Sequence, residues 1–321
     1  MLKKFIDLCA AEKIFDGVHK VLIAVSGGAD SLALAELMIN SRQRFNLELC
    51  IAHFEHGLRG QASLDDAAFV KEFSEERGIK FIGGHGDVKT FAAKNKISVE
   101  TAARILRYEF LSKLNFDATV LAHHADDQAE TILMRLLRGA TSSGLSAMKF
   151  RTFSKDYGLL IRPLLRFRKA ELENFCREKN LSPRLDSTNY ETEATRNKIR
   201  LELIPTLEEF NPALVETLCR FGEVTAEETD FLDAQAEKIF PAVVKDNSII
   251  RAEFLKLHGA LQRVVIKKFL AQVTGSVKDF GFVHFEGVRK VLINGLAGVE
   301  LPKNFRANLK RGRLTVTKNF Y

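Results

Sequence analysis

A short stretch near the N-terminus places two hydroxyls, two glycines and an acid directly after an apolar run. Residues 20–31 read KVLIAVSGGADS, and the residues that follow have the apolar spacing of a helix. A strand that passes into a helix through a tight turn needs residues that tolerate positive φ, and glycine does so. The unpaired N–H groups and the dipole of the helix then attract phosphate. The stretch therefore predicts a phosphate-binding loop; the alternative is a plain turn capped by Asp30 or Ser31.

The loop is not a Walker A motif, because the chain contains no Gly-Lys pair and that motif requires one. Its sequence, S-G-G-x-D-S, instead resembles the signature of the PP-loop ATP pyrophosphatases, which cleave ATP between its α and β phosphates and adenylate a substrate. This resemblance implies that Asp30 is catalytic and coordinates Mg²⁺. The residues that it implies to bind ATP are Ser26, Gly27, Gly28, Ala29, Asp30 and Ser31.

Alternating strand and helix patterns surround this loop. Strands are expected over 21–25, 47–53, 79–84 and 118–123, and helices over 63–78 and 97–115. Such an alternation predicts a parallel sheet with helices on both faces, in which ligands bind at the carboxyl ends of the strands. Ser26, His53 and His123 stand at three of these ends. We therefore expect the three side chains to lie at one pocket.

The later part of the chain has a looser pattern. Helices are expected over 167–180, 196–210, 213–240 and 252–272, followed by strand from about Val288. The Asn211-Pro212 pair is a turn signal and places a domain boundary near residue 210. The expected fold class is α/β: a parallel sheet of the PP-loop, adenine nucleotide alpha-hydrolase-like type, then a smaller, mainly helical C-terminal domain with some strand.

The composition is that of a globular protein, with 46% hydrophobic and 28% charged residues among 321. No apolar run approaches the ~18 residues of a membrane span, and the N-terminus lacks the pattern of a signal peptide. The four cysteines never form C-x-x-C, which argues against a zinc or iron–sulfur site and for the reducing cytoplasm. The net charge of +7 permits a polyanionic partner.

Two histidines and two acids stand together at the end of the last predicted strand, in the sequence LAHHADDQAET. Such a cluster fits a metal site, and it also fits a helix N-terminus with acids at the positive end of the dipole. The stretch resembles the H-H-x-D-D-Q-x-E-T element of the tRNA(Ile)-lysidine synthetase family. This resemblance implies catalytic roles for His123 and Asp127 and structural roles for Glu130 and Thr131.

Two further segments resemble the same family. IAHFEHGLRGQASLDDAAFV contains Arg59, whose planar guanidinium suits a phosphate, although an exposed loop arginine is often merely solvated. ETAARILRYEF contains Arg104 and Arg107, which share one helical face. The resemblance implies that Arg59 binds substrate or tRNA and that Arg104 and Arg107 contact nucleotide phosphate. Salt bridges to nearby acids are the alternative for the last two.

A fourth segment of this resemblance is LDSTNYETEATRNKIRLELIP, in which Asp186 to Asn189 are also good turn formers. Arg196 and Arg200 share a helical face here, and the resemblance implies contact with RNA or substrate. Separately, residues 301–321 contain six basic residues and no acid. The three that we expect to bind tRNA are Lys310, Arg311 and Arg313; the alternative is a solvated basic face.

The resemblance covers about residues 18–210 and implies a complete reaction. ATP adenylates the C2 oxygen of the wobble cytidine in an isoleucine tRNA with a CAU anticodon, and the side-chain amine of free L-lysine then displaces AMP. Residues 1–210 would form the ATP-binding catalytic domain and residues 211–321 a tRNA-binding domain, with Mg²⁺ as cofactor. The oligomeric state stays open, a homodimer included. The alternatives are another PP-loop enzyme, such as a tRNA thiolase, and an ATP-dependent RNA-binding protein without catalysis.

Overall fold

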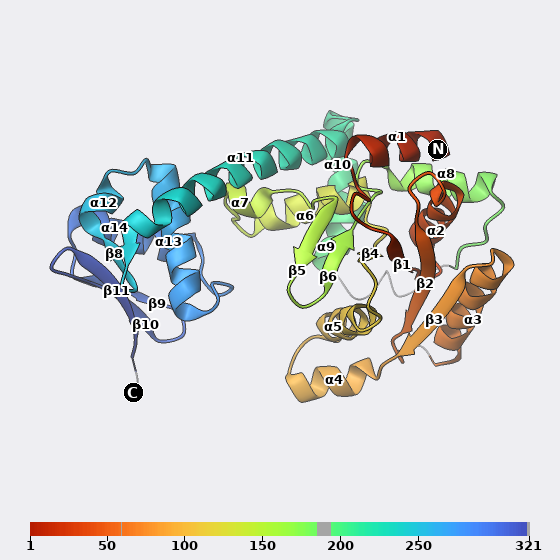
Figure 1. Cartoon of the computed structure of the whole chain (residues 1–321), viewed down its shortest axis with the longest axis horizontal. Coiled ribbons are helices and arrows are strands. Elements are labelled where there is room, and N and C mark those ends of the chain that lie inside the picture. Colours follow the sequence, from red (N-terminus) through yellow and green to blue (C-terminus); the bar gives the residue numbers. More distant parts are fainter. Residues whose placement is uncertain (59, 185–193, 320–321) are drawn as a thin grey trace. The chain divides into compact units, whose positions relative to one another are not determined.

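The computed structural model describes residues 1–58, 60–184 and 194–319, and these form two compact units (Figure 1). The first unit comprises Met1–Met134 and Ala147–Phe221, and the second comprises Arg135–Ser146 and Gly222–Tyr321. Two helices, α6 (Ala125–Leu137) and α11 (Leu214–Val243), begin in the first unit and end in the second. The assignment of catalysis to residues 1–210 and of tRNA binding to residues 211–321 stays a prediction.

The first unit is built on a six-stranded sheet in the order β3-β2-β1-β4-β6-β5. Its strands are β1 (Lys20–Ala24), β2 (Glu48–Glu55), β3 (Lys80–His85), β4 (Ala118–Val120), β5 (Arg151–Ser154) and β6 (Gly158–Ile161). All neighbours pair in parallel except β5, which is antiparallel to β6. This arrangement confirms the predicted parallel sheet; the β5–β6 hairpin was not predicted.

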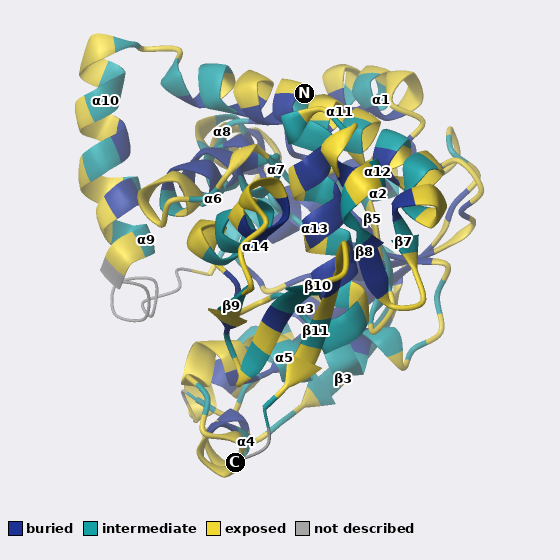
Figure 2. Ribbon diagram, turned by 90° about the vertical axis from the view of Figure 1, so that its left-hand side faces the viewer, coloured by how far each residue is buried: buried dark blue, intermediate teal, exposed yellow. Residues whose placement is uncertain are grey.

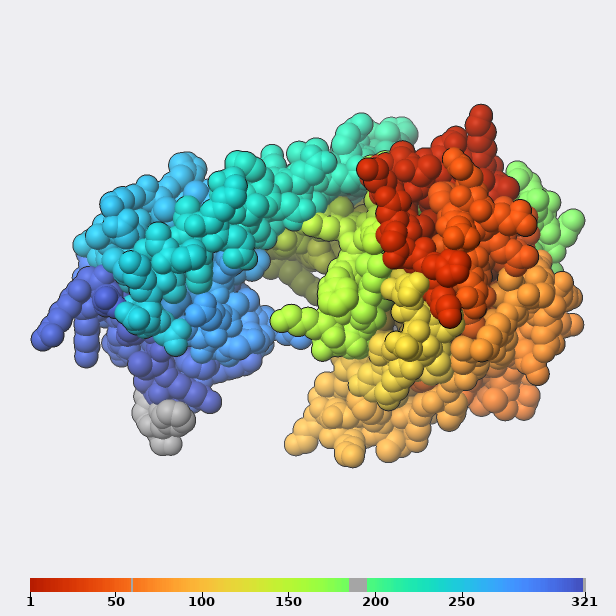
Figure 3. Space-filling view, in the orientation of Figure 1, coloured from red at the N-terminus to blue at the C-terminus, as the bar shows by residue number. Residues whose placement is uncertain are grey.

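Helices cover both faces of this sheet because successive side chains of a strand point to opposite faces. On β1, Val21 and Ile23 belong to a core that includes residues of α1, α2 and α8, whereas Leu22 packs in a separate cluster with Leu111 of α5. Full burial of each such aliphatic side chain contributes about 1.5–3 kcal/mol. The N-terminal helix α1 lies at the surface of this unit (Figure 3).

Several helices of the first unit lie where they were predicted, with ends that differ by a few residues, but the helix over residues 88–95 was not predicted and the one predicted over 196–210 is divided. The helices of this unit are α1 (Leu2–Ala11), α2 (Ala29–Ser41), α3 (Gln61–Glu76), α4 (Val88–Asn95), α5 (Val99–Ser112), α8 (Lys169–Glu178), α9 (Ala194–Lys198) and α10 (Ile204–Phe210). A π-helical turn, Ile199–Leu203, joins the last two. Burial is mixed within α10: Ile204 is buried, and the other residues of the helix are intermediate or exposed (Figure 2).

The second unit has an antiparallel sheet in the order β7-β8-β11-β10-β9. Its elements are α7 (Ser142–Leu145), β7 (Val244–Lys245), β8 (Ser248–Ile250), α12 (Arg251–Leu255), α13 (Gly259–Thr274), α14 (Phe282–Asn294), β9 (Gly298–Leu301), β10 (Phe305–Lys310) and β11 (Arg313–Lys318). Among the described residues, none of the helices is both long and apolar enough to cross a membrane.

The prediction of strand from about Val288 was wrong for the first residues of that stretch. Residues 282–294 are helical, and Val288, Val291 and Leu292 are buried at helical spacing in the core of the second unit. Gly295 has φ +71° and ends the helix in the left-handed conformation that glycine favours. The strands begin only at Gly298.

Candidate active site

The phosphate-loop residues lie between β1 and α2, where the strand order reverses. This position is the usual ligand site of open α/β sheets. Gly27 has φ +96°, which a residue with a side chain rarely adopts, and Gly28 is the N-cap of α2. The Ser31 hydroxyl accepts a hydrogen bond from the Ser26 amide at 3.1 Å and donates one to the Gly28 carbonyl at 2.9 Å. Ser31 thus closes the loop, and the N-cap residue itself has no side chain.

A cavity of about 390 Å³ opens beside this loop. Ser26, His53 and His123 all line it, as predicted from their places at the ends of three strands. Other residues at its wall are Gly28, Asp30, Ser31, Glu55, Asp66 and Arg107. The cavity therefore combines the donors of a helix N-terminus with acidic, basic and imidazole side chains.

Asp30, in the first turn of α2, presents one carboxylate oxygen with no protein partner. Its Oδ1 is buried and makes no hydrogen bond with a described residue, while its Oδ2 lies 3.5 Å from Nε2 of His124. No group of three or more His, Cys, Asp or Glu side chains among the described residues is arranged to hold a metal ion. Mg²⁺ commonly uses only one or two carboxylates together with substrate phosphates. The orphan Oδ1 fits that mode of binding.

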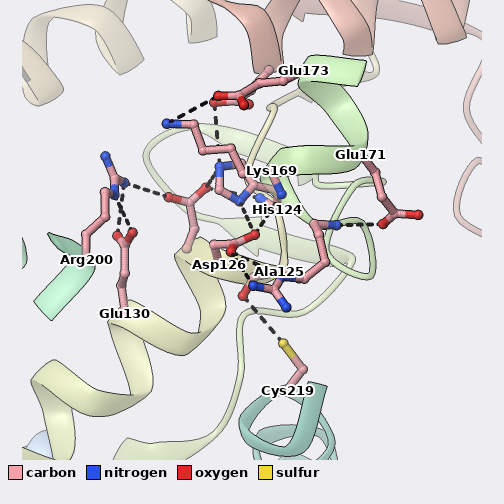
Figure 4. Close-up of polar contacts among 12 residues, drawn as sticks. His124, Ala125, Asp126, Glu130, Lys169, Glu171, Glu173, Arg200 and Cys219 are labelled. Carbon is pink, nitrogen blue, oxygen red and sulfur yellow. Dashed lines mark hydrogen bonds and ion pairs between the residues drawn. The ribbon is translucent and has the colours of Figure 1, made fainter. Parts of the chain in front are cut away.

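His124 lies between three carboxylates, one of which, Asp126, is labelled beside it in Figure 4. Its Nε2 is 3.5 Å from Oδ2 of Asp30 and 3.5 Å from Oδ2 of Asp127, and its Nδ1 is 3.5 Å from Oδ2 of Asp126. Burial alone lowers the pKa of this imidazole, but its contacts with Asp126 and Asp30 and the charge of Asp127 outweigh burial and raise the pKa to about 10. His124 is therefore an imidazolium at neutral pH.

The pKa of His123, the preceding residue, is shifted in the opposite direction. Burial lowers its pKa to about 4, and the nearby positive charges of Arg162 and Arg107 act in the same direction against the attraction of Asp127. Its Nδ1 is buried and has no hydrogen-bond partner among the described residues. A neutral imidazole at the cavity wall can accept or donate a hydrogen bond to a bound substrate.

Asp127 is ionised within this cluster. Burial raises the pKa of its carboxyl, but the charge of His124, a hydrogen bond from the His124 amide at 3.0 Å and the charge of Arg196 outweigh burial and lower it. Asp127 Oδ1 also lies 3.5 Å from Arg196 and 3.7 Å from Arg200. Both oxygens of this carboxylate thus lie beside positively charged side chains.

Glu130 is fully buried and binds two arginines of the segment that follows residue 193. It accepts hydrogen bonds from Nε of Arg196 at 2.6 Å and from Nε of Arg200 at 2.5 Å, with a second bond from Arg200 at 3.1 Å. The two arginines predicted to bind substrate or tRNA therefore contact Glu130 and Asp127. These contacts join the acids of α6 to α9 and the π-helical turn.

We expect Glu130→Ala to lower the free energy of unfolding by about 3 kcal/mol, because it leaves two partly buried guanidiniums without their carboxylate. Urea unfolding of the full chain measures this. Glu202→Ala is the control, since that exposed residue lies in the same segment and its substitution is expected to change stability by less than about 0.5 kcal/mol. A decrease of less than about 1 kcal/mol for Glu130→Ala would contradict this role of the carboxylate.

The other predicted residues lie in three different surroundings. Arg107 lines the cavity with its Nε buried and unbonded, and Arg104 is exposed with its guanidinium 5.1 Å from the Tyr108 ring centroid. Arg59, like residues 186–189, lies outside the described residues. Lys310, Arg311 and Arg313 belong to the β10–β11 hairpin of the second unit.

Three residues that organise this site were not predicted from the sequence: His124, Asp126 and Arg168. Asp126 accepts a hydrogen bond from the Lys169 amide at 2.8 Å and from Nε of Arg168 at 3.2 Å. The paired histidines were a signal for His124, but only the first was assigned a role. Nothing in the local sequence of Arg168 indicates its partners, which lie far away along the chain.

Comparison with known proteins extends the similarity over most of the chain. A family model described as the PP-loop domain matches residues 2–207. A tRNA(Ile)-lysidine synthase from Clostridium perfringens is 37% identical over 296 residues, which cover 90% of this chain and 62% of that protein. Another from Caldanaerobacter subterraneus is 32% identical over 328 residues, which cover 99% of this chain and 69% of that protein. The chain thus spans less than two thirds of the length of the first relative.

A solved structure shows the same fold. The U34-tRNA thiolase from Methanococcus maripaludis has a TM-score of 0.57 at 21% identity, over 70% of this chain and 78% of that one. At this level of identity the similarity concerns architecture alone.

Proposed function

Because the chain belongs to the PP-loop family and, by its similarity to curated relatives, to the tRNA(Ile)-lysidine synthases, we propose that it joins L-lysine to C2 of the wobble cytidine in an isoleucine tRNA with a CAU anticodon. ATP supplies the activation in this proposal and is cleaved to AMP and pyrophosphate. The observation that carries the proposal is the cavity, which brings the phosphate loop, Asp30 and His123 together in one place.

In the first step, the C2 oxygen of the cytidine attacks the α-phosphorus of ATP. The bond between the α and β phosphates breaks, and pyrophosphate leaves. The Ser26–Ser31 loop is suited to hold the pyrophosphate end, because Gly27 lets the backbone turn and α2 presents its N-terminus. Arg107 lines the cavity with a buried Nε that has no hydrogen-bond partner among the described residues, and it is suited to stabilise charge on the reacting phosphate.

Asp30 is the residue that would hold Mg²⁺, through its buried and unpartnered Oδ1. The ion, when bound, would offset the negative charge of the phosphates. Nε2 of His124 lies 3.5 Å from the other oxygen, Oδ2, so Oδ1 is the oxygen that would bind the ion.

In the second step, the ε-ammonium of lysine gives up a proton to solvent by way of the Asp127 carboxylate and its nitrogen forms a bond to C2; a second proton then passes from that nitrogen to solvent. The C2–O bond breaks, and AMP leaves with that oxygen. Asp127 is suited to bind the ammonium, since its carboxylate is ionised and nearly buried. Arg196 and Arg200, next to Asp127, provide positive charge for the carboxylate of the amino acid.

Pyrophosphate release tests the reaction class. The protein should release pyrophosphate from ATP only when an isoleucine tRNA with a CAU anticodon is present, because that tRNA supplies the attacking oxygen. A methionine tRNA, which shares the anticodon, is the control for recognition beyond the anticodon. An ATP-binding protein without catalysis would release no pyrophosphate with either tRNA.

The β10–β11 hairpin of the second unit is proposed to contact the tRNA backbone. Arg311 and Gly312 form its two-residue turn, and both have positive φ, as the usual hairpin turns require. Lys310 and Arg311 are exposed, and Arg313 forms an ion pair with Asp246 at 3.1 Å. The cluster at this turn adds local positive charge to a chain with an overall charge of +7.

We expect the double variant Lys310→Ala/Arg311→Ala to weaken tRNA binding and to lower the salt dependence of the binding constant by about 0.7–0.9 for each phosphate interaction that it removes. Filter binding or fluorescence titration at several salt concentrations measures this. The control is Lys256→Ala/Lys268→Ala, which removes two lysines of the same unit that are paired with Glu253 and Glu237. ATP affinity should not change. An unchanged salt slope would show that the turn does not touch the tRNA.

A further inference from the structure

We propose that Arg168, Asp126 and His124 form a positioning chain that holds the two reactive carboxylates, Asp30 and Asp127, in place for both steps of the reaction. The inference rests on the proposed function, and it assigns roles to three residues that neither step uses directly. None of the three is among the described residues that line the cavity.

The imidazole of His124 joins two acids that come from different parts of the fold. Asp30 is in the first turn of α2 and Asp127 in the first turn of α6, yet Oδ2 of each lies 3.5 Å from the same Nε2. His124 is only 2% exposed. The ring is therefore the group that lies against both carboxylates. Their separation and orientation therefore depend on where the ring stands.

Asp126 contacts the opposite side of the His124 imidazole. Its Oδ2 lies 3.5 Å from Nδ1 of His124, opposite the nitrogen that faces the two reactive acids. The same Oδ2 accepts a hydrogen bond from the Lys169 amide at 2.8 Å, and Oδ1 accepts one from Nε of Arg168 at 3.2 Å. Figure 4 shows Asp126 between His124 and the α8 segment. Asp126 is thus fixed from one side by the start of α8 and fixes His124 on the other.

Arg168 ties this arrangement to two more helices of the first unit. Besides Asp126, its guanidinium binds Glu208 of α10 at 2.9 Å and Glu216 of α11 at 3.0 Å. Three carboxylates around one guanidinium leave it little freedom to move. The chain from Arg168 through Asp126 to His124 therefore connects α8, α10 and α11 to Asp30, which lines the cavity, and to Asp127.

A purely structural role would give a different result from a positioning role. If the contacts served only to hold α8, α10 and α11 together, substitution would lower stability and the folded fraction while leaving the rate constants of folded molecules unchanged. If they position Asp30 and Asp127, substitution slows the chemistry of folded molecules, because small misplacements of reacting groups are costly. Both steps should be affected, since His124 contacts one acid of each.

The test uses Asp126→Asn in the full chain. The amide keeps the size of the side chain, and its oxygen can still accept a hydrogen bond from Arg168. It removes the negative charge that lies 3.5 Å from Nδ1 of His124, and its NH₂ group cannot accept the hydrogen bond that the Lys169 amide donates to Oδ2. Single-turnover experiments with enzyme in excess of tRNA report rate constants that do not depend on the folded fraction. Formation of adenylated tRNA is measured without lysine, and saturating lysine is then added to the accumulated adenylated tRNA. We expect each rate constant to fall by about 10–100-fold, while the Kd values of ATP and lysine change less than about threefold.

Arg168 supplies the second set of variants. Arg168→Gln should slow both steps, and Arg168→Lys, which keeps the charge, should restore part of the rate; this pair tests the inference even where Asp126→Asn folds poorly. The matched control is Arg166→Gln, because Arg166 lies two residues away and its ion pair with Glu12, at 2.7 Å, points to a different part of the unit. Both rate constants should be unchanged in that control.

The outcomes separate the inference from the function on which it rests. If the wild-type protein forms adenylated tRNA and the Asp126 and Arg168 variants do so at the wild-type rate, the positioning chain is refuted and the proposed function stands. Variants that are less stable to heat but have unchanged rate constants would refute the positioning chain as well. Wild-type protein that forms no adenylated tRNA would overturn both.

Discussion

Pyrophosphate release should fall by at least about 10²–10³-fold when Asp30 is replaced by alanine, because the loop then loses the one acid that can offset phosphate charge through a metal ion. Its Oδ1 is buried beside the cavity and has no partner in the described part of the chain. The neighbouring hydroxyls of Ser26 and Ser31 cannot take over, since they already bond to each other and to the loop backbone. The assay is tRNA-dependent release of pyrophosphate from ATP.

The fold of the Asp30→Ala variant should remain intact, because the polar contact that this side chain makes within the described residues is a 3.5 Å ion pair with His124. Thermal unfolding and tRNA binding check this. Asp65→Ala is the matched control: this aspartate is exposed on α3, accepts a hydrogen bond from the neighbouring Gln61 side chain at 2.9 Å, and should release pyrophosphate at the wild-type rate when replaced. A well-folded Asp30→Ala variant with near wild-type turnover would remove the loop from the site of ATP cleavage.

Asp127→Asn is expected to lower kcat/KM for lysine by about 10²-fold, since an amide gives up the charge that attracts the ammonium but keeps the size of the side chain. Its oxygen can still accept a hydrogen bond from the His124 amide, which in the wild type donates to Oδ2 at 3.0 Å. ATP binding at the Ser26–Ser31 loop should survive. Steady-state kinetics with lysine varied at saturating ATP and tRNA, together with direct ATP binding, measure both effects.

The pattern across the two steps identifies the role of Asp127. Adenylation of tRNA in the absence of lysine should be slowed far less than lysine transfer, whereas the Asp30 substitution should act mainly on adenylation. If Asp127→Asn left lysine kinetics unchanged, the amine site would lie elsewhere. Loss of ATP binding alone would instead place Asp127 beside the nucleotide.

The position of the cavity could be predicted from the sequence because it depends on local patterns. Buried apolar runs alternate with helical periods, and the topology of parallel sheets then places Ser26, His53 and His123 at neighbouring strand ends. The two glycines of the loop likewise follow from a requirement of the backbone, which Gly27 meets at φ +96°.

The contacts inside the site could not be predicted in this way, because they join residues far apart in sequence. His124 contacts Asp30, which is more than ninety residues away in the sequence, and Arg168 binds Glu216, which is 48 residues away. Neither the spacing of apolar residues nor the composition indicates which distant residues will be in contact. The helix over residues 282–294 was missed for another reason: its apolar residues were interpreted as short alternating runs, although Val288, Val291 and Leu292 fit one helical face.

The central claim is that this protein attaches lysine to a cytidine base, and mass analysis of tRNA nucleosides tests it most directly. An isoleucine tRNA transcript with a CAU anticodon is incubated with the protein, ATP, Mg²⁺ and lysine, then digested to nucleosides. We expect one cytidine to gain the mass of lysine less one water, and lysine labelled with heavy nitrogen at its side chain to carry the label into the product. An unmodified cytidine, in the presence of protein that binds both ATP and this tRNA, would contradict the claim.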